Sequence, residues 1–440
     1  MEIKELSAPM SSQSCGFERP AAFSPANLHA YLICFVLAAL PLLFSYRFWP
    51  GHDPVSDPNN EQFVLILFIQ ICAIILSGVL RTPPRHWDIR SIFFLSLVPI
   101  AIQAGHTVVQ ADMMAVSSLL RWMVLIAFGT SIYIGIRDRH LILSNDMAAM
   151  AVAGAALAYA TLFVLIYADQ QERDRLESIV IGFTNIRYTG YFVAPAIAIL
   201  LAFTTRFATL DRRSLVALGF AAFLCAFTFY TGTRSSVLSV TATILALALF
   251  SPRFRLWRLL PAFLVAGVIG YALASIAPPP ADSSFMISSR LHKMDSGRLQ
   301  IWLMLLQHWT TAPLFGFGEI DIGPMIGGFV AQAHNSVVQN LISVGLVGSL
   351  AIWPLVAILF WRMLQSLRSE ERSDVPLMAG ITCMFAHSML DGSLFFSYPL
   401  ALCALMIATF LAHRPTTPNS TATEASAQDD QASGLAFGPR

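Results

Sequence analysis

The sequence predicts an all-α polytopic integral membrane protein with about 12 transmembrane helices. Of its 440 residues, 56% are hydrophobic and only 12% are charged, and the mean hydropathy is +0.65. Soluble domains carry roughly 25% charged residues, about twice this share. Long apolar stretches separated by charged loops are the third observation. The net charge of +1 gives no support for a nucleic-acid partner, which would favour a basic domain.

Each predicted span is a stretch of about 20 largely apolar residues, which is the length that crosses a bilayer at 1.5 Å rise per residue. The twelve stretches are 28–48, 62–80, 91–109, 114–135, 146–167, 190–205, 214–231, 235–250, 257–276, 336–361, 376–390 and 393–412. They define a transmembrane domain over 28–412, preceded by a cytoplasmic segment over 1–27. The tail over 413–440 is rich in Ser, Thr, Ala, Gln and Asp, so we expect it to be disordered and cytoplasmic.

Loop charges predict the orientation, because cytoplasmic loops of membrane proteins are enriched in Lys and Arg. With the N-terminus inside, 18 of the 27 Lys and Arg residues face the cytoplasm and 8 face the opposite side, while Arg121 lies within a span. Both termini are therefore predicted to be cytoplasmic.

Two outer loops are longer than a tight connection, 168–189 and 277–335. Only the second, between the ninth and tenth spans, is large enough for a substructure. In it, Ser296-Gly297-Arg298 should open an amphipathic helix that runs through Trp309, with Asp295 or Ser296 as its N-cap. Pro313 should end this helix, and Phe315-Gly316-Phe317-Gly318 should form a turn.

Four outer-face residues are candidates for chemistry. Arg234 lies in a very short outer turn, and Arg298 stands one helical turn before Trp302, on the same face. Arg187 lies in the first long loop. His334 precedes a predicted helix start, where the helix dipole and nearby arginines should keep the imidazole neutral and able to accept a proton. The alternatives are arginines that reach lipid phosphate, a cation–π contact and a capping histidine.

Four further acidic or basic residues are of interest. Arg121 is a charge within a span, and such charges are generally functional, although the sequence does not identify its partner. Asp391, in an outer turn, could orient an arginine or a histidine. Glu319 and Asp321 form a carboxylate pair in a glycine-flanked loop, a weak candidate for metal ligation. No P-loop or zinc spacing is present in the sequence, so no cofactor and no metal is predicted.

These residues occur in motifs that resemble the O-antigen ligase and polymerase superfamily. The turn around Arg234 resembles the family's Gly-x-Arg turn, and 297–302 resembles its Arg-x-x-x-Trp helix. The segment 313–318 resembles its Pro-hydrophobic-x-Gly-x-Gly turn. Ala333-His334-Asn335-Ser336, followed by Gln339-Asn340 and 345–348, resembles its His-Asn signature. The four motifs stand in the family order across the last two-thirds of the chain.

The resemblance implies a twelve-span glycosyltransferase of the GT-C type in the bacterial inner membrane, with a metal-independent site facing the periplasm. It implies a glycan donor on undecaprenyl pyrophosphate and, for a ligase, a lipid A–core acceptor. Carried over by position, Arg234, Arg298 and His334 match the family's essential arginines and histidine. Arg187 matches less firmly. Trp302, Asp391 and Arg121 are supporting candidates for substrate binding.

The chemistry of these side chains agrees with that implication. A departing diphosphate gains negative charge, which arginine forks can bind in two-point fashion. The attacking sugar hydroxyl needs a base, which a neutral His334 can supply. Attack opposite the diphosphate would invert the anomeric centre.

Three other functions remain open at this stage. An O-antigen polymerase is the main alternative, and a protein O-oligosaccharyltransferase is the next. We favour a ligase because one large late loop holds both Arg298 and His334. A transporter of lipid-linked glycans would show midplane charges and discontinuous helices in corresponding halves of the chain, but only Arg121 qualifies and no repeat is visible.

Overall fold

The computed structural model describes residues 25–43, 58–80, 90–110, 113–167, 186–205, 211–250, 256–277, 297–319, 322–327, 332–368 and 374–413. Every regular element in this part of the chain is a helix. The elements are α1 (Pro25–Ala38), α2 (Leu40–Leu43), α3 (Pro58–Leu76), α4 (Arg90–Gln110), α5 (Met113–Arg137), α6 (Asn145–Tyr167), η1 (Ile186–Thr189), α8 (Gly190–Thr204), α9 (Arg212–Tyr230), α10 (Arg234–Phe250), α11 (Leu256–Ile276), α13 (Arg298–Trp309), α14 (Gly323–Ile326), α15 (Ser336–Arg368), α16 (Val375–Asp391), η3 (Ser393–Phe395) and α17 (Ser397–Ala412).

The all-helical, polytopic membrane architecture predicted from the sequence is confirmed. Within the described residues, each of the twelve predicted stretches contains an apolar helix. Six of these helices are long and apolar enough to cross a membrane by themselves, namely α4, α5, α6, α9, α11 and α15. The other six are shorter apolar helices, so the number of twelve crossings stays a prediction.

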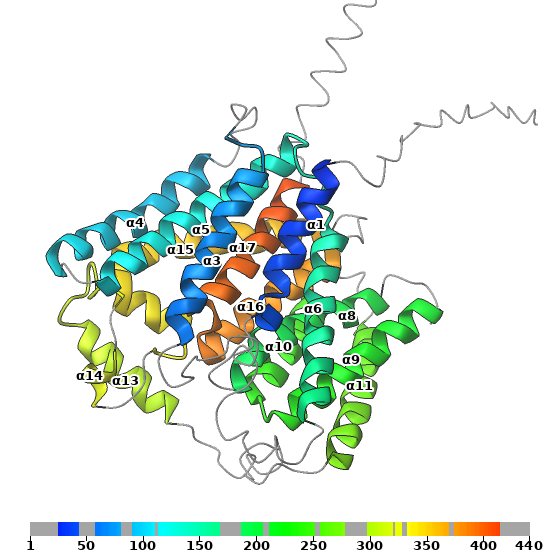
Figure 1. Ribbon diagram of the computed structural model, residues 1–440. Coiled ribbons are helices and arrows are strands. Elements are labelled where there is room, and N and C mark those ends of the chain that lie inside the picture. The colour runs from blue at the N-terminus through cyan, green and yellow to red at the C-terminus, as the bar shows by residue number, and fades with distance from the viewer. Residues whose placement is uncertain are drawn as a thin grey trace, which may run out of the picture.

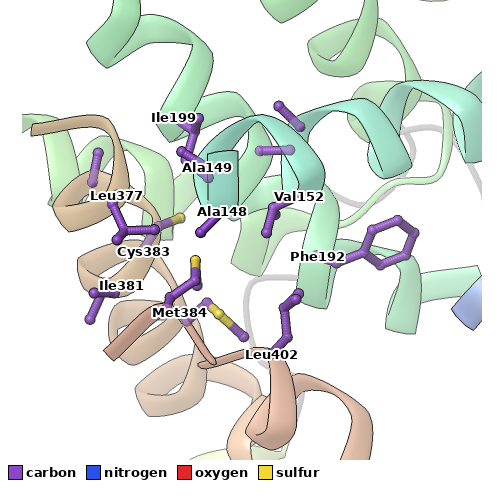
Figure 2. Close-up of a cluster of buried hydrophobic side chains, with 14 of the residues drawn as sticks. Ala148, Ala149, Val152, Phe192, Ile199, Leu377, Ile381, Cys383, Met384 and Leu402 are labelled. Carbon is purple, nitrogen blue, oxygen red and sulfur yellow. The ribbon is translucent and has the colours of Figure 1, made fainter. Parts of the chain in front are cut away.

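The centre of the molecule is a bundle in which α8 and α16 pack against α6, α10 and α17 (Figure 1). Small residues let these helices approach closely, as is typical of helix packing in membranes. Figure 2 shows this contact, with Ala148 and Ala149 of α6 facing Leu377 and Met384 of α16 and Leu402 of α17. The pair α9 and α11 lies along one edge of the bundle, and α4, α5 and α15 lie along the other (Figure 1).

The tenth predicted span is not one continuous helix, which corrects the prediction over 336–361. Its helix α15 breaks at Gly345, where φ is 63° and ψ is −165°, a conformation open to glycine but not to other L-residues. The turn at 313–318 fills the break with backbone hydrogen bonds: Phe317 N–H donates to Ile342 O at 2.7 Å, and Leu346 N–H donates to Pro313 O at 2.9 Å. The first nine residues of α15 therefore form a separate short helix.

The large loop forms a small substructure with its own apolar core. Leu305 of α13, Ile322, and Val338 and Ile342 at the start of α15 are buried together, apart from the main core. Helices α13 and α14 lie beside each other at one end of the bundle (Figure 1). The expected helix is thus present and ends at Trp309 as predicted, but it begins at Arg298, later than an N-cap at Asp295 or Ser296 would place its start.

The N-cap of α13 differs from the prediction. It is Gly297, with φ at 72° and no side-chain capping bond. A glycine takes this left-handed conformation without a steric penalty, which explains its place there. Asp295 and Ser296, like Asp321 and the terminal segments 1–24 and 414–440, lie outside the described residues. The same holds for 168–185 in the first long loop.

Candidate active site

The carboxylate of Asp391, at the end of α16, is where side chains from three other segments meet. Arg298 Nη2 donates to Asp391 Oδ1 at 2.8 Å, and Ser235 Oγ donates to Oδ2 at 3.1 Å. His334 Nδ1 lies 3.2 Å from Oδ1. Arg298 also donates from Nη1 to the carbonyl of Leu390. The Asp391 side chain is 7% exposed, whereas Arg298 and His334 are 30% and 24% exposed, so the carboxylate is buried behind two groups that a substrate can reach.

The backbone at His334 takes an unusual conformation. Its φ is 52°, in the left-handed region that non-glycine residues rarely adopt. Asn335, which follows, caps α15: its Oδ1 accepts from Val337 N–H at 2.9 Å and from Val338 N–H at 3.1 Å. Its amide also donates to Met389 O at 3.0 Å, which fastens the start of α15 to the last turn of α16. The strained conformation is thus held from both sides.

The residue before this histidine is fixed by two side chains. Trp302 Nε1 donates to Ala333 O at 2.7 Å, and Ala333 N–H donates to Gln339 Oε1 at 2.8 Å. The shared face of Arg298 and Trp302, expected from their spacing, therefore does two things. Its arginine reaches Asp391, while its indole holds the backbone that leads to His334.

Arg234 is brought to the same place by a tight turn. Gly232, with φ at 66°, connects α9 to α10, and Arg234 is the first residue of α10. The next residue, Ser235, is the one that contacts Asp391. Arg234 is half-buried, and it is the chain neighbour of the residue that contacts the Asp391 carboxylate.

A buried polar layer lies behind Asp391, and the sequence analysis missed it. His387, one helical turn earlier on α16, is fully buried, and its Nε2 lies 3.3 Å from Ser236 Oγ. The ring of Tyr191 packs edge-on against His387 at 5.3 Å between centroids. The spacing of four residues between His387 and Asp391 was the one available signal, since it places both on one helix face. Without the fold, nothing connects either to Tyr191 on α8.

Arg121 has partners other than Asp391 in the structure. The Arg121 guanidinium forms an ion pair with Glu319, and its Nη1 donates to Phe395 O at 2.8 Å. The partner that the sequence left unidentified is thus a carboxylate of the large loop. Arg187 lies in η1, just before α8, and its side chain is outside the described residues. Its expected contact with the donor stays a prediction.

The charges of the site explain what the arrangement can do. Asp391 offsets the charge of Arg298 at close range, so the two cationic groups Arg298 and Arg234 can coexist near a bilayer without net repulsion. His334 Nδ1 faces Asp391 Oδ1 at 3.2 Å, and in the tautomer that carries its proton on Nδ1 the ring presents Nε2 as an acceptor. Among the described residues, no three His, Cys, Asp or Glu side chains gather as metal ligands would.

Part of the chain that contains these residues matches a known protein family. Residues 219–353 match the family model described as O-antigen ligase. The resemblance to the O-antigen ligase and polymerase superfamily is confirmed. The match includes Arg234, Arg298, Trp302 and His334, whereas Asp391 lies beyond it.

The O-antigen ligase match indicates the type of protein and the type of activity. Together with the apolar helices it supports a multi-pass bacterial membrane protein. It also indicates an activity of the O-antigen ligase or polymerase type. No curated protein matches the chain.

Proposed function

We propose that this protein is an O-antigen ligase of the bacterial inner membrane. It transfers a glycan from undecaprenyl pyrophosphate to a sugar hydroxyl of lipid A–core, on the periplasmic face and without a metal. The observation that carries the proposal is the meeting of Arg298 and His334 on one carboxylate, Asp391, beside the Arg234 turn, within or next to the segment that matches the O-antigen ligase family.

Arg298 and Arg234 bind the diphosphate of the donor in this proposal. A guanidinium presents donors in a planar fork that fits phosphate oxygens, and it stays charged at any physiological pH. The negative charge on the diphosphate grows as the glycosidic bond to it breaks. Fixed cationic donors at that position stabilise the transition state more than the bound donor. Arg187 serves as an approach contact for the same group.

His334 acts as the general base. Its Nε2 takes the proton of the acceptor hydroxyl as the hydroxyl oxygen bonds to the anomeric carbon of the donor. The bond from that carbon to the diphosphate oxygen breaks, and undecaprenyl pyrophosphate leaves with the electron pair. Attack from the opposite face inverts the anomeric centre. Asp391 supports the base by holding Nδ1, as orienting carboxylates do in other acid–base pairs.

The proposal is tested with purified protein in lipid nanodiscs. The protein is incubated with lipid-linked glycan and either lipid A–core or a second lipid-linked unit, and products are separated by gel and mass spectrometry. Transfer to lipid A–core, unaffected by a chelator, is the expected result. Elongation of the lipid-linked unit alone would make it a polymerase, and movement of donor between leaflets without a new glycosidic bond would make it a transporter.

A further inference from the structure

Arg121 lies outside the segment that matches the O-antigen ligase family, and its side chain has several specific contacts. It lies on α5, eight residues after the helix begins, which is roughly 12 Å along the axis. Its side chain is only 12% exposed. A cation at such a place is retained only if other groups compensate its charge.

The compensating carboxylate comes from the large loop. Glu319 follows the turn after α13, and its side chain is 10% exposed. One of its oxygens pairs with Arg121, and the other accepts from Trp122 Nε1 at 2.9 Å. Two adjacent residues of α5 therefore bind both oxygens of one carboxylate. This holds the loop at a fixed height on the bundle.

The same guanidinium also reaches the segment that follows Asp391. Its Nη1 donates to the carbonyl of Phe395, in η3, at 2.8 Å. The guanidinium carbon Cζ lies 5.4 Å from the centroid of the Phe395 ring. Only Gly392 separates η3 from Asp391. Arg121 thus connects two segments, one leading from Arg298 and one leading from Asp391.

Helix α4 strengthens the attachment of the turn. His106 Nε2 lies 2.9 Å from Phe315 O, and Gln110 Nε2 donates to Phe317 O at 2.6 Å. Both carbonyls belong to the turn between α13 and Glu319. The loop substructure is therefore attached to α4 and α5 by side chains at its far side, while Arg298 attaches it to Asp391 at its near side.

We infer that Arg121 is a positioning residue: by binding Glu319 and Phe395 it holds the α13 substructure against the end of α16, so that Arg298 and His334 stay in register on Asp391. This inference rests on the proposed glycosyl transfer. It assigns Arg121 a structural role in place of the substrate contact expected from the sequence. Small errors in the placement of reacting groups are costly, since a displacement of about 1 Å can lower a rate by about 10²-fold.

The test uses four variants of the full chain: Arg121→Gln, Glu319→Gln, the double variant, and Arg137→Gln as a matched control. Arg137 lies at the opposite end of α5 and donates to Ala412 O at 3.4 Å, far from the loop. Each single variant at the pair should lower kcat roughly 10-fold or more, with smaller changes in the KM of either substrate. The double variant should recover to within about 3-fold of wild type, because two amides leave no buried charge unpaired. The control should stay near the wild-type rate.

A second measurement does not depend on activity. Hydrogen exchange of the α13 amides, recorded in nanodiscs, should be faster in both single variants than in the double variant or the control. A near-normal rate for Glu319→Gln beside an inactive Arg121→Gln, or a double variant no better than Arg121→Gln, would overturn the inference in favour of substrate contact. If the wild type transfers no glycan, the proposed function fails, and the exchange pattern alone then supports or overturns the holding role of the ion pair.

Discussion

At the residue scale, the site depends on one buried carboxylate that organises a cation and an imidazole. Asp391 accepts from Arg298 and Ser235 and lies beside His334. A buried charge with several donors is held in one geometry, because breaking any one contact leaves it undersatisfied. The chemistry we propose therefore depends as much on Asp391 as on the groups it orients.

Replacement of either arginine by lysine should show whether the fork matters. In Arg298→Lys and Arg234→Lys, the charge stays but the planar two-point contact is lost, so kcat should fall on the order of 10²-fold. Single-turnover transfer assays on correctly inserted protein measure this. Near-normal rates in both variants would remove the arginines from the diphosphate site.

The assignment of His334 as the general base predicts that transfer and donor binding respond differently to mutation. His334→Ala should abolish transfer while donor affinity stays close to wild type, because the imidazole acts on the acceptor hydroxyl. Asp391→Asn should bind the donor more weakly than His334→Ala does, because the loss of the carboxylate also releases Arg298. The kcat of Asp391→Asn should fall on the order of 10²-fold or more. Donor titration monitored by fluorescence and transfer assays separate the two effects. A His334→Ala protein that cannot bind donor would make the histidine a diphosphate ligand instead.

At the element scale, two short structures decide where the functional side chains point. One is the helix α13, which directs Arg298 toward Asp391 and binds the backbone before His334 through Trp302. The other is the break in α15, which receives the 313–318 turn. Both are maintained by hydrogen bonds between segments that are distant along the chain.

The indole of Trp302 offers a test with a control in the same helix. Trp302→Phe keeps the ring volume but loses the bond to Ala333 O, so we expect kcat to fall several-fold with little change in donor KM. Trp309→Phe is the matched control, because the buried Nε1 of Trp309 has no hydrogen-bond partner. Equal losses in the two variants would show that general packing, and not the bond to Ala333, matters.

The break at Gly345 should be sensitive to a single methyl group. In Gly345→Ala, the added Cβ would meet the carbonyl oxygen of Leu314, and φ at 63° is unfavourable for alanine. We expect a loss of about 1–3 kcal/mol in the local stability of the turn and lower activity. Gly219→Ala, in the middle of α9 with nothing within 4 Å of its new Cβ, is the control. Thermal denaturation and hydrogen exchange of 313–318 check this, and a Gly345→Ala protein as stable as the control would contradict it.

At the scale of the whole molecule, the predicted sidedness places the loop substructure in the periplasm and both termini in the cytoplasm. A cysteine at Leu299, which is 63% exposed on α13, should react in intact cells with a maleimide that cannot cross the membrane. A cysteine at the exposed His413 should react only after the membrane is opened. The unmodified chain provides the background, because four of its five described cysteines are buried. The reverse labelling pattern would invert the topology.

The sequence alone determined the membrane class and the helix positions, and it indicated four members of the candidate site: Arg234, Arg298, His334 and Asp391. Apolar stretches separated by charged loops carry this information locally, so the helix bounds from α4 to α11 differ from the predicted spans by only one or two residues. The motifs around Arg234, Arg298 and His334 are local too, and they indicated the family before any geometry was known.

Only the tertiary structure decided how these residues are joined. That Asp391 receives both Arg298 and His334, that Glu319 is the partner of Arg121, and that α15 breaks to admit a turn all depend on contacts between segments up to 198 residues apart. Apolar periodicity determines which residues are helical, but it does not determine which buried charge meets which. That choice is made when helices pack, because each buried charge must then find a partner among the groups that packing brings within reach.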